Sequence, residues 1–142
     1  MTREEERDLL LRDLCARLRY GVKCHFKYGT AEDDITLKCI DDDVARFKYG
    51  WYGEFHVIID PDYIKPYLRP MSSMTEEEQR EMKRLWFDNN KAVFADPPEI
   101  RCYRFYDSNV VDWLNAHHFD YRGLIEKGLA IEVTDENNPY KQ

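Results

Sequence analysis

The sequence lacks the features that would place the chain in a membrane or outside the cell. No run approaches the roughly 20 apolar residues that a membrane-spanning helix needs, and residues 1–6 contain no apolar stretch that could act as an export signal. The four cysteines form no CxxC pair: they are Cys15, Cys24, Cys39 and Cys102. We therefore expect a cytoplasmic protein with reduced thiols, in which Cys24 and Cys39 are small core residues of strands.

The motifs of the commonest catalytic and nucleotide-binding sites are missing too. The 6 glycines form neither a phosphate-binding loop nor a dinucleotide-binding fingerprint. The serines occupy positions typical of turns and helix caps, and none lies in a GxSxG turn: they are Ser72, Ser73 and Ser108. The sequence therefore predicts no cofactor and no catalytic residue, and it favours a non-enzymatic protein over a hydrolase with dispersed active-site residues.

Basic residues are the minority among the charged ones. The chain has 21 Lys and Arg against 28 Asp and Glu, which gives a net charge of −7. Proteins that bind nucleic acid without sequence preference need a basic surface that releases counterions from the phosphates. The charge therefore argues against non-specific nucleic-acid binding, and the acidic excess is typical of a surface that keeps a protein soluble.

What the sequence does contain is the material for one folded core. Hydrophobic residues make up 43% and aromatic residues 14% of the 142 residues, and 10 residues are tyrosines. This composition excludes a wholly disordered chain, and the length suits a single domain. No linker or internal repeat divides the chain, so we expect one domain over residues 1–142, with a flexible polar tail at 134–142.

The first element is an amphipathic helix. A capping box formed by Thr2 and Glu5 predicts a helix over residues 3–18, which Gly21 ends. Its apolar stripe repeats every four residues, at Leu10, Leu14 and Leu18. We place Asp13 and Arg17 on the opposite, polar side.

Four segments then alternate apolar and polar residues, as strands with one wet face do. They span residues 22–28, 35–39, 45–49 and 55–59. The links between them are short and polar, and they lie at 29–34, 41–43 and 50–53. Links of this length leave no room for crossover helices, so the pattern predicts a four-stranded antiparallel β-meander.

The second half of the chain is less regular. Three prolines keep residues 61–74 extended or turned. A second capping box at Thr75 begins a helix over about 76–87 whose apolar face carries Met82, Leu85 and Trp86. Residues 100–106 have the pattern of a short strand.

The last elements complete an α+β fold. Asp107 or Ser108 caps a helix that ends near His118, and a short helix over 121–127 precedes Gly128 in the left-handed position. Residues 130–133 add a short strand. We predict an N-terminal helix, a four-stranded antiparallel meander, and C-terminal helices that cover the sheet.

The four histidines are the candidates for a metal site. His117 and His118 are adjacent, and adjacent residues point to different sides of a helix. His25 and His56 lie on the wet faces of separate strands and meet only if the strand order brings them together. These spacings do not match those of known sites, so we predict no metal.

The link at 50–53 carries large aromatic side chains between two glycines. Tyr49, Trp51 and Tyr52 lie at this hairpin. Exposed rings at such a place stack on a base or anchor a partner protein. Large aromatic residues more often pack, however, so the interpretation we favour is that these rings fold back over the open face of the sheet.

The turn at residues 117–122 has more recognition chemistry than a turn needs. Its Asp120 suits a helix cap, and His118 and Phe119 continue an apolar face. His117, Tyr121 and Arg122 have no evident structural role, and we predict that they bind a partner or a ligand. Arg122 at a helix start can hold an anion together with backbone N–H groups. The more common alternative is a structural ion pair with Asp112 or Glu126.

Three segments resemble those of a family of small uncharacterised proteins from Bacteroides-type gut bacteria, their prophages and other mobile elements. They are residues 10–22 (LLRDLCARLRYGV), 64–78 (IKPYLRPMSSMTEEE) and 112–130 (DWLNAHHFDYRGLIEKGLA). Together they cover somewhat under half of the chain. The family has no established activity, so the resemblance implies no catalytic residue.

The resemblance does imply a setting for the protein. It suggests an accessory binding protein of a phage or mobile element in the cytosol of a bacterial host, acting on a host protein or a small anionic ligand. One alternative is an anti-defence protein that sequesters a nucleotide immune signal. An unpaired edge strand in the predicted sheet would also allow a homodimer.

Overall fold

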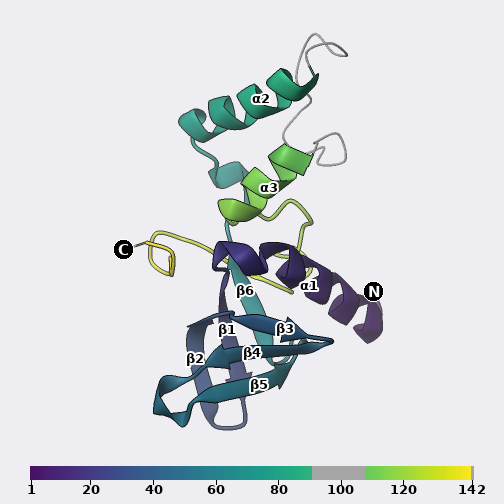
Figure 1. Cartoon of the computed structure of the whole chain (residues 1–142), viewed down its shortest axis with the longest axis vertical. Helices are drawn as coiled ribbons and strands as arrows, with labels where there is room; N and C mark the ends of the chain where they lie inside the picture. Colours follow the sequence, from purple (N-terminus) through teal and green to yellow (C-terminus); the bar gives the residue numbers. More distant parts are fainter. Residues whose placement is uncertain (91–107, 142) are drawn as a thin grey trace.

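The computed structural model describes residues 1–90 and 108–141 (Figure 1). The strand predicted over 100–106 lies outside the described residues, as do Cys102 and the side chains of Tyr52 and Trp86. In the parts that are described, no helix is long and apolar enough to cross a membrane. The fold is mixed α+β, with an N-terminal helix, antiparallel sheets and further helices.

Helix α1 (Arg3–Arg17) begins at the predicted cap, where the Glu5 N–H donates a hydrogen bond to the Thr2 hydroxyl over 3.1 Å. It continues as a 3₁₀ turn, η1 (Leu18–Tyr20), and ends at Gly21 with a φ of +70°. Its buried face contains the expected Leu10 and Leu14.

The predicted polar side of α1 is wrong at two positions. Asp13 and Arg17 are fully buried, next to the two leucines. Positions 10, 13, 14 and 17 lie on one face of a helix, because they are three or four residues apart. The charged pair therefore belongs to the core stripe.

Strands β1 (Lys23–Tyr28) and β2 (Ala31–Thr36) form an antiparallel hairpin. Tyr28 pairs with Ala31, so only Gly29 and Thr30 make the turn, and Gly29 has a φ of +63°. The polar loop predicted over 29–34 is thus a strand from Ala31 onward. Its acidic residues, Glu32, Asp33 and Asp34, are all exposed, so their composition is that of a loop.

The strand predicted over 35–39 is divided, because residues 35 and 36 end β2 and Cys39 begins β3 of a second sheet. This sheet contains β3 (Cys39–Asp41), β4 (Val44–Lys48) and β5 (Glu54–Ile58), in that order and antiparallel. The turn between β3 and β4 contains Asp42, in a left-handed conformation. A 3₁₀ turn, η2 (Gly50–Tyr52), joins β4 to β5. The predicted single meander of four strands is therefore divided between two sheets.

The first sheet gains two strands, of which the sequence predicted only the last. Its order is β2-β1-β6-β7, with β6 (Ile64–Leu68) antiparallel to β1 and β7 (Ile131–Glu132) parallel to β6. Within the segment predicted to be extended or turned, β6 is paired on both sides, and Pro66 lies opposite Cys24. The strand predicted over 130–133 is β7, shorter than expected.

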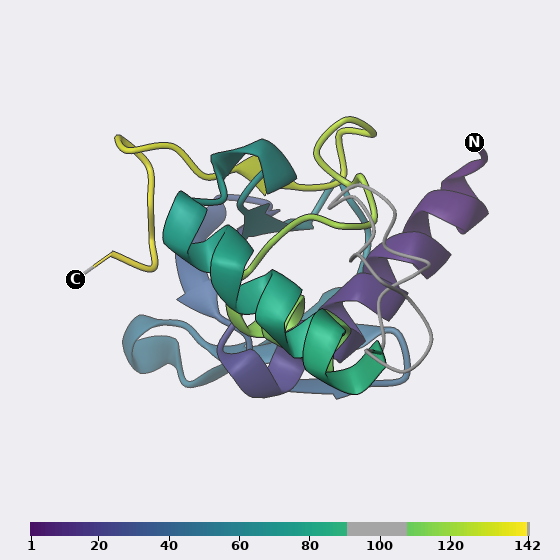
Figure 2. The ribbon, with the colours of Figure 1, turned by 90° about the horizontal axis from the view of Figure 1, so that it is seen from above.

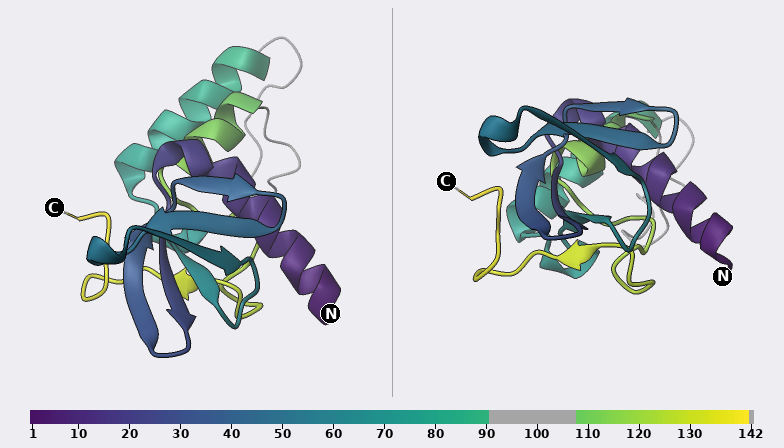
Figure 3. Two further views of the ribbon diagram at one scale, coloured as in Figure 1. Left: turned by 60° about the horizontal axis from the view of Figure 1, so that its bottom comes forward. Right: turned by 90° about the horizontal axis from the view of Figure 1, so that it is seen from below.

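The main core lies between the two sheets and under α1. Phe26 of β1 contacts Phe47 of β4 with ring centres 4.8 Å apart, and Phe55 of β5 at 5.4 Å. Leu10 and Leu14 close this core from the helix side. Figure 3 shows the strands of the two sheets gathered beside α1.

Helices α2 (Glu76–Asn90) and α3 (Ser108–Ala116) build a second cluster with the 3₁₀ turn η3 (Met71–Ser73). The cluster contains Met82, Val110, Trp113 and Leu114. At the start of α2 the capping box is reciprocal, because the Thr75 N–H donates to Glu78 and the Glu78 N–H donates to the Thr75 hydroxyl. Figures 1 and 2 show α2 and α3 stacked at one end of the molecule, with α1 between them and the strands. They do not cover the sheet as predicted.

Candidate functional site

The turn at residues 117–122 ends α3 in a Schellman motif. The Phe119 N–H donates to the Leu114 carbonyl over 2.9 Å, and the His118 N–H to the Asn115 carbonyl over 3.1 Å. His118 has a φ of +63°, a left-handed conformation that costs about 1–2 kcal/mol for a residue other than glycine. The chain then pairs with Arg69, whose N–H donates to the His118 carbonyl over 2.7 Å. Hydrogen bonds on both sides hold the strained residue in place.

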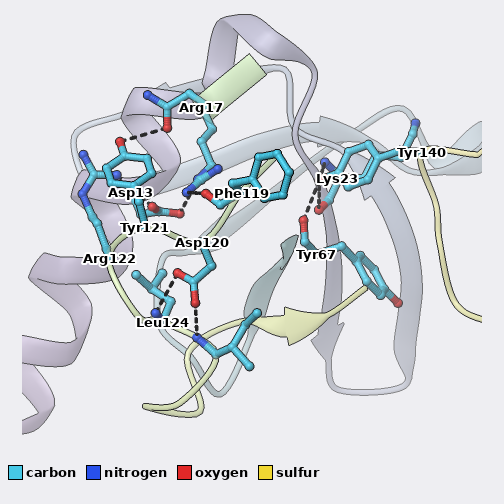
Figure 4. Close-up of polar contacts among 12 residues, drawn as sticks. Asp13, Arg17, Lys23, Tyr67, Phe119, Asp120, Tyr121, Arg122, Leu124 and Tyr140 are labelled. Carbon is cyan, nitrogen blue, oxygen red and sulfur yellow. Dashed lines mark hydrogen bonds and ion pairs between the residues drawn. The ribbon is translucent and has the colours of Figure 1, made fainter. Parts of the chain in front are cut away.

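Asp120 occupies the backbone donors that the predicted anion site requires. Its carboxylate accepts hydrogen bonds from the Leu124 N–H over 2.8 Å and from the Ile125 N–H over 2.9 Å (Figure 4). The helix predicted over 121–127 is a series of turns, although Gly128 has the expected left-handed φ of +75°. Arg122 therefore does not lie at a helix start, and the nearby N–H groups already bind a carboxylate.

Arg122 forms an ion pair, but with neither of the expected partners. Its Nη1 lies 2.8 Å from Oδ1 of Asp13, and the other oxygen of the same carboxylate accepts from Arg17 Nε over 2.9 Å. Asp13 and Arg17 are fully buried. One carboxylate thus pairs with two guanidinium groups, and this contact ties the turn to α1 (Figure 4).

Tyr121 lies between the two guanidinium groups. The Arg17 guanidinium lies 5.3 Å from the centre of its ring, and that of Arg122 4.6 Å. Its hydroxyl donates to the Asn115 side chain over 3.0 Å, and burial raises the pKa of Tyr121. Arg17 also donates to the Phe119 carbonyl over 2.6 Å. The predicted site residues Tyr121 and Arg122 are brought together, in a buried structural network.

The two histidines of the turn are engaged as well. His117 stacks on Trp113 with ring centres 4.1 Å apart, and its Nδ1 lies 2.9 Å from the Trp113 carbonyl. His118 stacks on Tyr140 at 3.6 Å. Burial, followed by the charge of Arg17, lowers the pKa of His118 to about 4, so this imidazole is neutral near pH 7.

The segment predicted as a flexible tail makes specific contacts. The Tyr140 hydroxyl accepts a hydrogen bond from the Lys23 N–H over 3.0 Å and donates one to the Tyr67 carbonyl over 2.7 Å. Burial is the largest cause that raises the pKa of Tyr140. We call residues 134–141 the strap. Its Tyr140 therefore lies between β1 and β6.

The hairpin between β4 and β5 has the opposite character. Trp51 is 98% exposed, and the flanking Gly50 and Gly53 have φ values of +56° and +84°. The expectation that the rings of this link fold back over the sheet is wrong for Trp51. It holds for Tyr49, which contacts Phe26 at 5.0 Å between ring centres.

Trp51 belongs to an end of the molecule where aromatic rings gather. Tyr28 and Tyr49 both contact Phe55, with ring centres 6.4 Å and 5.6 Å away, and Tyr63 contacts Tyr28 at 5.5 Å. Tyr28 is 52% and Tyr63 36% exposed. We name these five residues the aromatic end: Tyr28, Tyr49, Trp51, Phe55 and Tyr63.

A depression with basic walls lies beside this hairpin, on β3 and β4. Lys38, Arg46 and Lys48 line it, together with the exposed Cys39 and with Glu54. The prediction of Cys39 as a core residue is therefore wrong, whereas Cys24 is buried. Basic walls beside an exposed tryptophan suit a partner with acidic groups.

His25 lies on the outer face of the first sheet, between two carboxylates. Its Nδ1 is 2.7 Å from Asp34, its Nε2 is 2.8 Å from Glu32, and Asp34 also accepts from the Tyr67 hydroxyl over 2.7 Å. Burial opposes the charged imidazole, but the hydrogen bonds to Asp34 and Glu32 outweigh it and raise the pKa of His25. His56 belongs to the other sheet. Among the described residues, no group of three His, Cys, Asp or Glu side chains is arranged to hold a metal ion.

Three residues that organise the turn were not predicted from the sequence: Asp13, Arg17 and Tyr140. For the first two a signal exists, because their spacing places them on the stripe of Leu10 and Leu14. For Tyr140 we find no local signal, since its partners are more than 20 residues away. Comparison with known proteins adds no further assignment: no protein-family model, no curated protein and no solved structure matches the chain.

Proposed function

We propose that the chain is a non-enzymatic binding protein and that it holds a host protein through the aromatic end. The observation that carries this proposal is the exposure of Trp51, at 98% of the side chain. A large ring in water is unfavourable unless it is covered part of the time, and tryptophan and tyrosine are enriched among the residues that dominate protein interfaces.

The local backbone supports a role in binding. The Trp51 ring is carried by a short turn between two glycines with positive φ values. The neighbouring Tyr49 packs against Phe26 and Phe55. The exposed ring therefore lies next to a residue that is packed on the fold.

The charges beside the aromatic end favour a protein partner with an acidic surface. Lys38 and Lys48 are exposed at the adjacent depression, and Arg46 there is paired with Asp41 over 2.7 Å. The net charge of the chain is −7. A local basic area on an acidic protein steers an acidic surface towards that area and away from the rest. The setting, an accessory protein of a phage or mobile element, rests on the resemblance of the three segments.

The test is a paired substitution of two exposed hydrophobic residues. Trp51→Ala removes the proposed anchor, and Ile58→Ala is the matched control, because Ile58 is 48% exposed in β5 of the same sheet. Proteins captured from a Bacteroides-type host lysate by the wild type are compared with those captured by each variant. The protein that Trp51→Ala loses is then purified and titrated against all three.

We expect Trp51→Ala to weaken binding of that protein at least tenfold, a typical loss for a central aromatic anchor, and Ile58→Ala to leave it unchanged. The proposal is wrong if both variants bind every captured protein as the wild type does. Equal losses in the two variants would also contradict it, because they would place the contact elsewhere on the sheet.

A further inference from the structure

The ring of Tyr140 fills a slot between separate parts of the chain. One face of the ring stacks on His118, with 3.6 Å between ring centres and 10° between planes. The hydroxyl lies between the Lys23 N–H, at 3.0 Å, and the Tyr67 carbonyl, at 2.7 Å (Figure 4). The slot therefore provides a stacking surface, a backbone donor and a backbone acceptor.

The slot exists because the ladder between β1 and β6 opens at this place. Cys24 and Pro66 are paired, but Lys23 and Tyr67, one residue further along each strand, are not. Their backbone groups bind the Tyr140 hydroxyl instead of each other. A donor and an acceptor on neighbouring strands form the pattern that the edge of a heterocyclic ring complements.

The strap is anchored to the body of the fold mainly by this one residue. Within the described strap, the side chain of Asn137 accepts from the Thr134 N–H and donates to the Glu132 carbonyl. The Asn138 side chain accepts from the Tyr140 N–H. These hydrogen bonds are local. The hydrogen bonds of the strap to β1 and β6 come from Tyr140. A segment held at one point detaches as a unit when that point is released.

We infer that the strap is removable and that the slot beneath Tyr140 binds a planar heteroaromatic ring of the nucleobase class. The ligand ring stacks on the neutral His118, accepts a hydrogen bond from the Lys23 N–H and donates one to the Tyr67 carbonyl. Strap and ligand compete for one place, so the strap lowers the apparent affinity by the fraction of molecules in which it is detached. This site is separate from the aromatic end and does not depend on the proposed function.

Two substitutions at one position test the inference. Tyr140→Ala empties the slot, whereas Tyr140→Phe keeps a ring in it and removes only the hydroxyl. Both full-length variants are first shown to be folded by circular dichroism and thermal melting. AMP, GMP, CMP and UMP are then titrated into each variant and into the wild type by calorimetry.

We expect Tyr140→Ala to bind at least one nucleotide at least tenfold more tightly than the wild type does, with Tyr140→Phe between the two. No binding by folded Tyr140→Ala, or equal affinity in all three proteins, overturns the inference. If Tyr140→Ala does not fold, the inference is tested on the wild type by hydrogen exchange. Saturating nucleotide must then increase hydrogen exchange of residues 134–141, and unchanged exchange overturns the inference.

Discussion

The turn at residues 117–122 and the hairpin at Gly50–Tyr52 both concentrate aromatic side chains, and the fold uses them in opposite ways. In the turn, the hydrogen-bonding groups of Asp120, Tyr121 and Arg122 bind other residues of the chain. In the hairpin, Trp51 is almost fully exposed. A segment with many functional groups is therefore not necessarily free to bind a partner, because the fold itself can engage those groups.

The difference follows from where each segment lies. The turn is packed between α1, β6 and α3, so every polar group in it needs a partner in the fold. The hairpin projects from the end of a sheet, where water forms hydrogen bonds with its polar groups. The apolar ring of Trp51 gains nothing from this exposure to water. A buried turn with many functional groups is thus more often a structural junction than a binding site.

Three segments of the chain, residues 10–22, 64–78 and 112–130, meet at this junction. Arg17 of the first binds the Phe119 carbonyl of the third over 2.6 Å. Arg69 of the second lies over the Phe119 ring at 4.1 Å and forms a bidentate ion pair with Glu78. Trp51 lies outside all three segments. These segments therefore form part of the scaffold, and the proposed contact surface lies outside them.

The largest expected effect is on stability, at Asp13. Asp13→Ala leaves the buried Arg17 without its carboxylate and removes the partner of Arg122, so we expect the free energy of unfolding to fall by about 3–5 kcal/mol. Urea denaturation measures it. Asp8→Ala on the exposed side of α1 is the matched control and should change stability by less than about 0.5 kcal/mol. If both variants lost a similar amount of stability, the claim that Asp13 ties the turn to α1 would be wrong.

A second effect concerns the pH dependence of stability, at the partly buried His118. The pKa of His118 is about 4 in the folded chain, against an ordinary value of 6.5. The unfolded chain therefore takes up a proton between pH 6.5 and 4 that the folded chain does not, and stability falls as the pH drops through this window.

We expect this loss to be about 2 kcal/mol, with allowance for partial solvent screening. His118→Asn removes the titrating group and keeps a residue that tolerates the left-handed conformation. The stability of the variant between pH 6.5 and 4 should therefore depend less on pH. An unchanged pH dependence, measured by urea denaturation across the window, would show that His118 is not the group responsible.

His25 should show the opposite dependence, with a smaller size. Because its pKa is raised by Asp34 and Glu32, its stabilising contribution is complete below pH 6.5 and is lost as the pH rises through the folded-state pKa. The groups are partly exposed, so we expect only a few tenths of a kcal/mol. Titration of the imidazole by NMR gives the pKa directly. A value below 6.5 would contradict the arrangement seen in the structure, in which both ring nitrogens face carboxylates.

The smallest expected effect is that of Trp51→Ala on stability. Because the ring contacts almost nothing, its removal should change the free energy of unfolding by less than about 0.5 kcal/mol. Thermal or urea unfolding measures it. A loss above about 1 kcal/mol would show that the ring packs against the fold in solution, and the comparison between hairpin and turn would no longer hold.

The local elements were largely predictable from the sequence, and their assembly was not. Capping residues and alternation identified α1, β1, β4 and β5, because those signals depend on neighbours in the chain. The pairing of β6 with β1, the insertion of Tyr140 and the contact of Arg122 with Asp13 join residues far apart in sequence. No local pattern encodes such contacts.

The candidate site shows the same limit. The chemical inventory of residues 117–122 indicated a binding site, because the sequence does not reveal that Asp13 supplies the partner for Arg122. The sequence also does not distinguish a packed tryptophan from an exposed one, and the packed interpretation was favoured for Trp51. Exposure is decided by the tertiary fold.

The account's central claim is that the hairpin contacts a partner and the turn does not. The most direct measurement places a photo-crosslinking amino acid at position 51 in one protein and at position 126, an exposed residue of the segment after the turn, in another. Each is irradiated in a Bacteroides-type host lysate under identical conditions. The account predicts a discrete covalent adduct with one protein from position 51 and none from position 126. An adduct from position 126 with none from position 51 would contradict it.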